Sequence, residues 1–287
     1  RWKDISQSIL KTESDASMLL FVGDMTAYDH PGLWWTFFDQ GKALLSSIPM
    51  VPAVGNHDHT TVHGEGPKIF ETLFPVDQSS GIPNVFSVRH GDAAFLVFDA
   101  TKTDGFTKDT GSQFVWAKAS LDNLAKTSSP TWVFASWHIP AYNVGARHYL
   151  EQYTYRDVTS LFDGKVDWVF CAHEHLYQRI KPMRYSGTLA PSGKYGRGSQ
   201  DGVGYVVTPP ARQVPNTSII PATEDKGYYR DRLAYPLPSP NTDEVPSENG
   251  YVSVELQSKT MILRTYGLGT PSGPVAPHVV DQYVYSK

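Results

Sequence analysis

Short hydrophobic runs alternate with segments of helical periodicity along the first part of the chain. The runs have strand length and predict buried β-strands at residues 18–22, 50–54, 94–98, 131–137 and 166–171. Helical spacing of apolar residues predicts helices at residues 2–11, 31–45, 112–126 and 155–162. A further run at residues 85–88 precedes the third strand and predicts a hairpin with it. The alternation of strand and helix predicts an α/β fold whose central strands are largely parallel.

The later part of the chain loses this regularity and then regains it. Between residues 182 and 248, Gly, Pro, Ser, Tyr and Asn dominate, and one strand-like run stands at residues 204–208. We therefore predict long surface loops there. Strict alternation returns at residues 251–256, 261–266 and 279–285, which predicts antiparallel closing strands. We expect a single domain over residues 1–287 with a loop-rich insertion at about 182–248.

The amino-acid composition argues against several classes of function. The chain has 25 basic and 29 acidic residues and a net charge of −4, so it has no basic excess with which to bind nucleic acid. Its apolar runs, such as residues 18–22, are far shorter than the roughly 20 residues of a transmembrane helix. The single cysteine, Cys171, excludes an internal disulfide and is expected to pack within a strand. We expect neither a nucleic-acid nor a membrane partner, and the oligomeric state stays open.

Polar residues of metal-ligand type follow four of the predicted strands. They are Asp24, Asn56, His138 and the pair His173 and His175. In open α/β sheets, ligands bind beyond the carboxyl ends of the strands, so these side chains are expected to converge on one crevice. A mixed set of oxygen and nitrogen donors suits Mn, Fe or Zn. The strand ends therefore predict a transition-metal site.

Taken in order, these motifs resemble the signature of the calcineurin-like metallophosphoesterase superfamily. The motifs are Gly23-Asp24, Gly55-Asn56-His57-Asp58, His138 and His173-Glu174-His175. Within that superfamily, residues 55–59 are most similar to the purple acid phosphatase type, and residues 205–208 resemble its late core strand. The resemblance spans about residues 18–285 apart from the insertion. It implies a β-sandwich of two mixed sheets flanked by helices, in four layers.

The resemblance also implies a centre of two divalent or trivalent transition-metal ions, Fe, Mn or Zn. Asp24 would bridge the two ions. One ion would also be held by Asn56, His138 and His173, and His175 would bind the other ion. Two such ions generate a hydroxide that attacks phosphorus and clamp a phosphoryl oxygen, so no protein nucleophile is needed.

Catalysis in such a centre needs a proton for the leaving oxygen. By resemblance His57 would be this general acid, with Asp58 orienting its imidazole. The implied function is a metal-dependent phosphoesterase acting on small-molecule phosphate esters, and an acid-phosphatase-like monoesterase is the favoured form. A phosphodiesterase of the same fold is the alternative, because loops in the 182–248 insertion decide how open the site is.

The first metal motif of the family has no counterpart in this chain. An Asp at the end of a strand should precede Gly23-Asp24 by some tens of residues, whereas Asp4 and Asp15 lie in helical or loop context. We therefore expect either that the first strand is missing from a chain truncated before Arg1, or that one metal site is incomplete. If those ligands are absent from the mature protein, a non-catalytic scaffold holding one metal is the alternative function. Retention of His57 and Asp58 favours the enzyme.

Other residues have weaker links to the site. The metal-binding Tyr of purple acid phosphatases is expected three residues after Asp24, where Ala27 stands, and Tyr28 one position later is the alternative ligand. Loop or surface positions, with phosphate contact as the alternative, are expected for His59, His63, Arg147, His148 and Lys181. Asn216-Thr217-Ser218 fits an N-glycosylation acceptor, a triplet that often occurs by chance. Abundant aromatic residues, Pro and Gly favour a secreted, periplasmic or extracellular protein.

Overall fold

The protein is described by a computed structural model over residues 1–59, 68–76, 78–127, 130–185, 187–211, 213–221, 230–238 and 241–287. The α-helices are α1 (Trp2–Thr12), α2 (Pro31–Leu45), α3 (Asn56–His59), α4 (Lys68–Leu73), α5 (Ser112–Thr127) and α6 (Arg156–Thr159). The 3₁₀ turns are η1 (Thr103–Phe106), η2 (Tyr149–Tyr155) and η3 (Arg230–Arg232). None of the helices in these ranges has both the length and the hydrophobicity that a membrane crossing requires.

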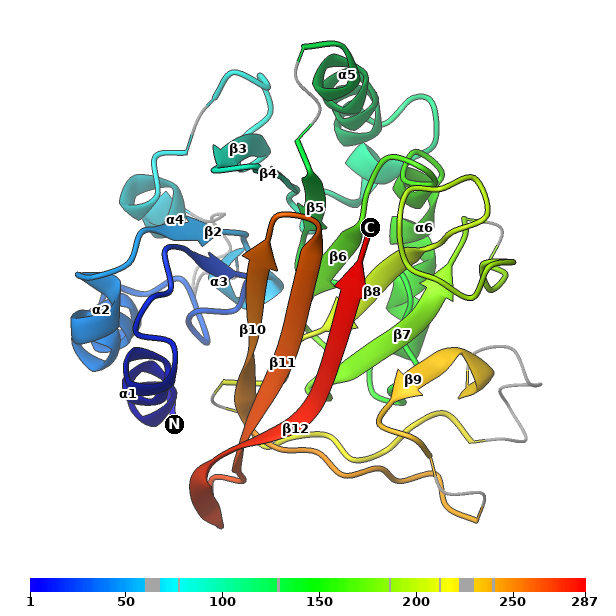
Figure 1. The fold of residues 1–287 in the computed structure, drawn as a ribbon. Helices are drawn as coiled ribbons and strands as arrows, with labels where there is room; N and C mark the ends of the chain where they lie inside the picture. Colours follow the sequence, from blue (N-terminus) through cyan, green and yellow to red (C-terminus); the bar gives the residue numbers. More distant parts are fainter. Residues whose placement is uncertain are drawn as a thin grey trace.

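A seven-stranded mixed sheet forms the centre of the molecule (Figure 1). Its strands, in spatial order, are β3 (Phe86–His90), β4 (Ala93–Val97), β5 (Trp132–Ser136), β6 (Trp168–Cys171), β8 (Val203–Val207), β7 (Gln178–Met183) and β9 (Leu233–Tyr235). Strands β4, β5, β6 and β8 pair in parallel, and the outer strands pair antiparallel. The parallel centre predicted from the sequence is confirmed, whereas β7 and β9 were not predicted.

The second layer consists of two separate sheets. The strands β1 (Leu19–Phe21) and β2 (Met50–Pro52) form a parallel pair, and β10 (Gly250–Gln257), β11 (Thr260–Gly269) and β12 (Pro274–Ser286) form an antiparallel sheet. Aromatic side chains of the central sheet, among them Trp132 and Phe134, pack against Met261 and Leu263 of β11. The sheets thus form a sandwich as expected, but the second half is divided rather than one mixed sheet, because no described strand links β1 to β10.

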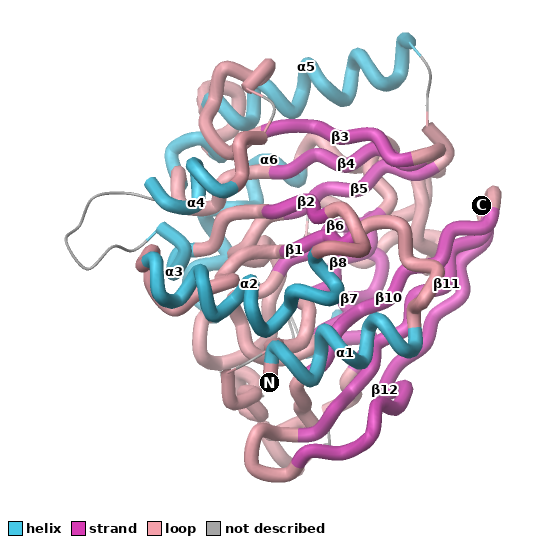
Figure 2. Tube along the Cα trace, turned by 90° about the vertical axis from the view of Figure 1, so that its left-hand side faces the viewer, coloured by secondary structure: helices cyan, strands magenta, loops and turns pink. Residues whose placement is uncertain are grey.

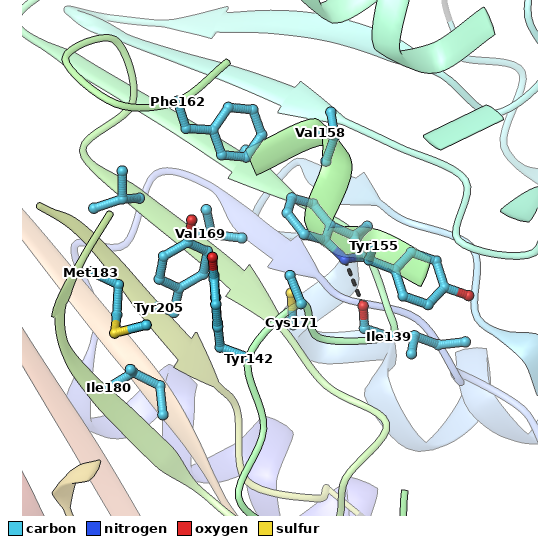
Figure 3. Packing of buried hydrophobic residues seen from close by; sticks show 14 of the residues in the cluster. Ile139, Tyr142, Tyr155, Val158, Phe162, Val169, Cys171, Ile180, Met183 and Tyr205 are labelled. Atoms are coloured by element: carbon cyan, nitrogen blue, oxygen red, sulfur yellow. Dashed lines mark hydrogen bonds between the residues drawn. The ribbon is translucent and has the colours of Figure 1, made fainter. Parts of the chain in front are cut away.

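Helices cover both outer faces and complete the four layers. On one side α1 and α2 lie next to β1 (Figure 2), with Trp2 stacked on Phe37 at 5.3 Å between ring centroids. On the other side α5, α6, η1 and η2 contribute to a larger cluster, part of which Figure 3 shows. Cys171 lies in this cluster, and burial raises the pKa of its thiol, so it is a core residue as predicted. The helix predicted at residues 155–162 is wrong in extent, because a 3₁₀ turn ends at Tyr155 and α6 has only four residues.

Candidate metal centre

The candidate ligands follow the carboxyl ends of four strands, as the sequence predicts. Asp24 follows β1, Asn56 follows β2, His138 follows β5 and His173 follows β6. Asp24 and His173 adopt left-handed backbone conformations, with φ of 55° and 65°. Such values are uncommon outside glycine and concentrate where function requires a strained geometry. The two residues turn sharply out of their strands.

Two glycines allow the strand ends to approach one another. A Cβ atom on Gly23 would lie 2.6 Å from His138 Nδ1. A Cβ atom on Gly55 would lie 2.2 Å from Asp24 Oδ1 and 2.3 Å from the Asp24 nitrogen. Distances this short are far inside van der Waals contact, so both positions require glycine. This is the physical reason for the Gly-Asp and Gly-Asn pairs in the sequence.

We expect Gly55→Ala to displace the Asp24 carboxylate. Overpacking of this kind costs about 1–3 kcal/mol of stability, and here the added methyl group meets the candidate ligand directly. The variant should bind Zn²⁺ or Mn²⁺ more weakly than the parent chain in calorimetric titration. Gly81→Ala is a suitable control, because no heavy atom lies within 4 Å of its Cβ position and its positive φ imposes backbone strain alone. Unchanged metal affinity in Gly55→Ala would contradict the placement of Asp24.

His138 is held so that one defined nitrogen faces Asp24. The ring is buried, and its Nδ1–H donates to the Val22 carbonyl at 2.8 Å. Its Nε2 therefore lies at the site, 3.0 Å from Asp24 Oδ2. Burial alone lowers the pKa of His138, but the facing Asp24 carboxylate outweighs burial and raises it. Burial likewise raises the pKa of Asp24, yet His138 and the His57 N–H outweigh it and lower that pKa to about 2.

His173 completes a compact group of donors. Its Nδ1 lies 3.3 Å from His138 Nε2, and the ligand atoms of Asp24, His138 and His173 all lie within 4.8 Å of one another. Burial, reinforced by His138, lowers the pKa of His173 to about 3, so its ring is neutral at ordinary pH. One carboxylate and two imidazoles with their ligand atoms this close together suit a transition metal such as Zn²⁺, Mn²⁺ or iron. The residues present therefore fit a metal ion.

Of the other predicted ligands, one lines the same cavity as this group, one lines a neighbouring hollow and one is exposed. His175 lines the same cavity of about 140 Å³ as Asp24, His138 and His173. Burial, followed by the Arg147 charge, lowers the pKa of His175 to about 4. Asn56 begins α3 and lines a neighbouring hollow, and the next backbone N–H, that of His57, donates to Asp24 Oδ1 at 2.9 Å. Tyr28 is 51% exposed and is not among the described residues that line the cavity.

Asp58 differs from its expected role. Its carboxylate is fully buried and accepts the backbone N–H groups of Thr26 and Gly55, both at 3.0 Å. The His57 ring is instead placed by its Nδ1, which lies 3.1 Å from the Ala27 carbonyl. The expectation that Asp58 orients the His57 imidazole is therefore wrong for this structure. Asp58 ties the loop after Asp24 to the loop before Asn56.

A residue that sequence reasoning missed, Glu151, contacts the ligand group directly. Its Oε2 accepts from His173 Nε2 at 2.8 Å, and its Oε1 accepts from His148 Nδ1 at 2.7 Å. A carboxylate on the outer nitrogen of an imidazole fixes which nitrogen is left for a metal. The His148 and His173 rings lie 4.0 Å apart between centroids. The i,i+3 spacing of His148 and Glu151 was a signal for this pair, but their link to His173 depends on tertiary structure.

The remaining candidates divide between the site and the surface. Arg147 Nη1 lies 3.1 Å from His175 Nδ1, so its charge stands beside the cavity. His59 lines the neighbouring hollow with Asn56. Lys181 donates to the Asp231 carbonyl, which fits the surface role expected for it. His63 lies outside the described residues.

The sequence and the fold are similar to those of plant purple acid phosphatases. Purple acid phosphatase 22 of Arabidopsis thaliana is 28% identical over 190 residues, which are 62% of this chain and 42% of the relative. Purple acid phosphatase 23 of the same plant is 30% identical over 166 residues, or 56% of this chain and 34% of the relative. The chain thus spans less than half the length of these relatives.

A solved structure of purple acid phosphatase PPD1 from yellow lupin (Lupinus luteus) seeds has a similar fold. Its TM-score is 0.69 at 16% identity, over 99% of this chain and 49% of that chain. At this identity the likeness concerns the fold alone.

The family model described as Calcineurin-like phosphoesterase matches residues 2–177. This range is more than half of the chain and contains Asp24, Asn56, His138, His173 and His175. The resemblance inferred from the motifs is confirmed, and the chain belongs to the calcineurin-like phosphoesterase family.

Proposed function

We propose that the protein is a metal-dependent phosphoesterase that hydrolyses phosphate monoesters of small molecules. The observation that carries this proposal is the convergence of Asp24, His138 and His173, whose ligand atoms lie within 4.8 Å of one another. Asn56 would complete this ligand set, and Asp24 with His175 would hold a second ion. When bound, such ions activate water and neutralise charge on the phosphoryl group.

The chain supplies the groups that bind and protonate the substrate. His57 lines the cavity, and its Nδ1–H donates to the Ala27 carbonyl, which leaves Nε2 to carry the proton for the leaving oxygen. Arg147 brings a permanent positive charge beside His175, and His148 lies against His173. These cationic and hydrogen-bonding groups suit the dianionic phosphate of a monoester.

Metal titration combined with a substrate pair tests this function. We expect Mn²⁺, Zn²⁺ or iron to raise the melting temperature and to give turnover of p-nitrophenyl phosphate well above that of bis-p-nitrophenyl phosphate. The first ion should bind more tightly than the second, because Asp24 and His175 offer the second ion two protein ligands and catalytic sites usually keep about three. Faster turnover of the diester would favour a phosphodiesterase. Metal binding without any turnover would favour the scaffold.

A further inference from the structure

A buried carboxylate lies, in the sequence, between two of the three histidines of the candidate metal centre. Glu174 stands between His173 and His175 in the sequence and is fully buried. Its Oε2 accepts from Asn143 Nδ2 at 3.1 Å and from the His148 backbone N–H at 2.9 Å. Its Oε1 accepts from Asn216 Nδ2 at 2.6 Å. All three of these donors are uncharged, and a buried carboxylate depends on such hydrogen bonds to remain in the interior.

These bonds join three segments that are distant in the sequence. The segment after β6 carries His173 and His175, the loop at residues 143–148 carries Arg147 and His148, and residues 213–220 belong to the loop-rich insertion. The loop wraps closely around the carboxylate, since a Cβ on Gly145 would lie 2.3 Å from Glu174 Cδ. The insertion also pairs with this loop, through the Ala146 N–H to the Ser218 carbonyl at 3.0 Å.

Asn216 is fixed in one orientation by its own surroundings. Its Oδ1 accepts from the Ser218 N–H at 3.1 Å, and its Nδ2 also donates to the Ser218 carbonyl at 3.1 Å. Its backbone N–H donates to the His175 carbonyl at 2.6 Å. A rotation of the amide by 180° would lose both side-chain contacts with Ser218. The Nδ2 that the glycosylation triplet would offer to a glycan is therefore directed at Glu174.

From this geometry we propose that Glu174 and Asn216 are positioning residues, which fix the places of Arg147 and His148 relative to the candidate metal ligands His173 and His175. The proposal rests on the phosphoesterase function proposed above, because Arg147 and His148 are there the groups that meet the phosphate. In this proposal the Asn216 side chain of the glycosylation-like triplet supports the site through its hydrogen bond to Glu174. The insertion thereby acts on substrate binding through Glu174.

An exchange of the two polar groups tests the pair directly. Asn216→Asp places a second carboxylate against Glu174 Oε1. Glu174→Gln places its NH₂ group either against the Asn216 NH₂ or, with the amide turned over, against the Asn143 NH₂ and the His148 N–H, so one donor pair clashes in both orientations. The double variant Glu174→Gln with Asn216→Asp restores one donor facing one acceptor. Ser218→Ala is the matched control, because it removes the glycosylation triplet and keeps the backbone groups that Asn216 contacts. All chains are produced in a host that adds no N-linked glycan.

We expect Asn216→Asp to lower kcat/KM by about ten to a hundredfold, the usual range for residues that orient ligands from outside the metal shell. The loss should appear mainly in KM, because Arg147 and His148 lie on the substrate side. The double variant should recover about tenfold of it, since groups in direct contact couple strongly. Ser218→Ala should stay within about twofold of the parent. A double variant no better than Asn216→Asp, or a Ser218→Ala variant equally impaired, would overturn the proposal.

Hydrogen exchange gives a readout that is independent of activity. The amides of Ala146 and His148 should exchange faster in Asn216→Asp and return towards the parent rate in the double variant. Unchanged exchange in Asn216→Asp would also overturn the proposal. If the parent chain with metal hydrolyses no phosphate ester, the proposed function fails while the exchange data still decide the positional link. If the Asp variants do not fold, Asn216→Ser removes the donor to Glu174 without adding a charge. Its kcat/KM and amide exchange are then compared with those of Ser218→Ala, and equal values in the two variants would overturn the proposal.

Discussion

Replacing Asp24 by asparagine is expected to abolish tight metal binding and to lower phosphatase turnover by at least about a thousandfold. Asp24 is the only carboxylate among the five candidate ligands, and its Oδ2 lies 3.0 Å from His138 Nε2. Metal ions contribute several kcal/mol of transition-state stabilisation, and each 1.36 kcal/mol corresponds to a factor of ten in rate. Asparagine keeps the shape of the side chain but removes the one negative charge among the five candidate ligands.

Elemental analysis after dialysis measures this loss. The parent chain should retain at least one metal ion, and Asp24→Asn should retain almost none. Asp15→Asn, which changes an exposed carboxylate, is the matched control and should behave as the parent does. Zn²⁺ should raise the melting temperature of the parent and of the control but not of Asp24→Asn. Full metal content in Asp24→Asn would remove this residue from the ligand set.

Hydrophobic patterning predicted the part of the site that depends on strand ends. The neighbouring parallel strands β5 and β6 bring His138 and His173 to one edge of the central sheet, and β1, which pairs in parallel with β2 in the second layer, carries Asp24 at its own carboxyl end. The hydrophobic periodicity locates the strand ends, and the order of the strands along the chain indicates which ends carry polar residues, so a single sequence was enough to find these positions. The strands β7 and β9 escaped prediction because they lie among residues rich in charge, Pro and Gly, where alternation is weak.

Contacts between loops could not be read from the sequence. Asp58 stands beside His57 in the chain, yet its carboxylate accepts backbone N–H groups of Thr26 and Gly55. Glu151 reaches His173 across 22 residues, at a distance set by the packing of η2. A sequence pattern gives which residue types are present, whereas the partner of a buried carboxylate depends on the loops that enclose it.

His57→Ala is expected to lower turnover by about a hundredfold to ten-thousandfold for substrates with poor leaving groups, the usual contribution of a general acid. Metal content should stay near that of the parent, because the His57 contact with Asp24 is made by the backbone N–H, which alanine retains. The structure thus separates the two roles: Asp24 acts on metal binding, and the His57 ring acts on the leaving oxygen.

The leaving group distinguishes an acid from a binding residue. Nitrophenolate departs without a proton, so the defect of His57→Ala should shrink for p-nitrophenyl phosphate and be largest for an alkyl phosphate, whose alkoxide must be protonated. His59→Ala is the matched control, since His59 lies on the same short helix and lines the neighbouring hollow. Steady-state kinetics on both esters with a fixed metal measure the two effects. A loss of equal size on both esters would show that the His57 ring binds the phosphate rather than protonating the leaving oxygen.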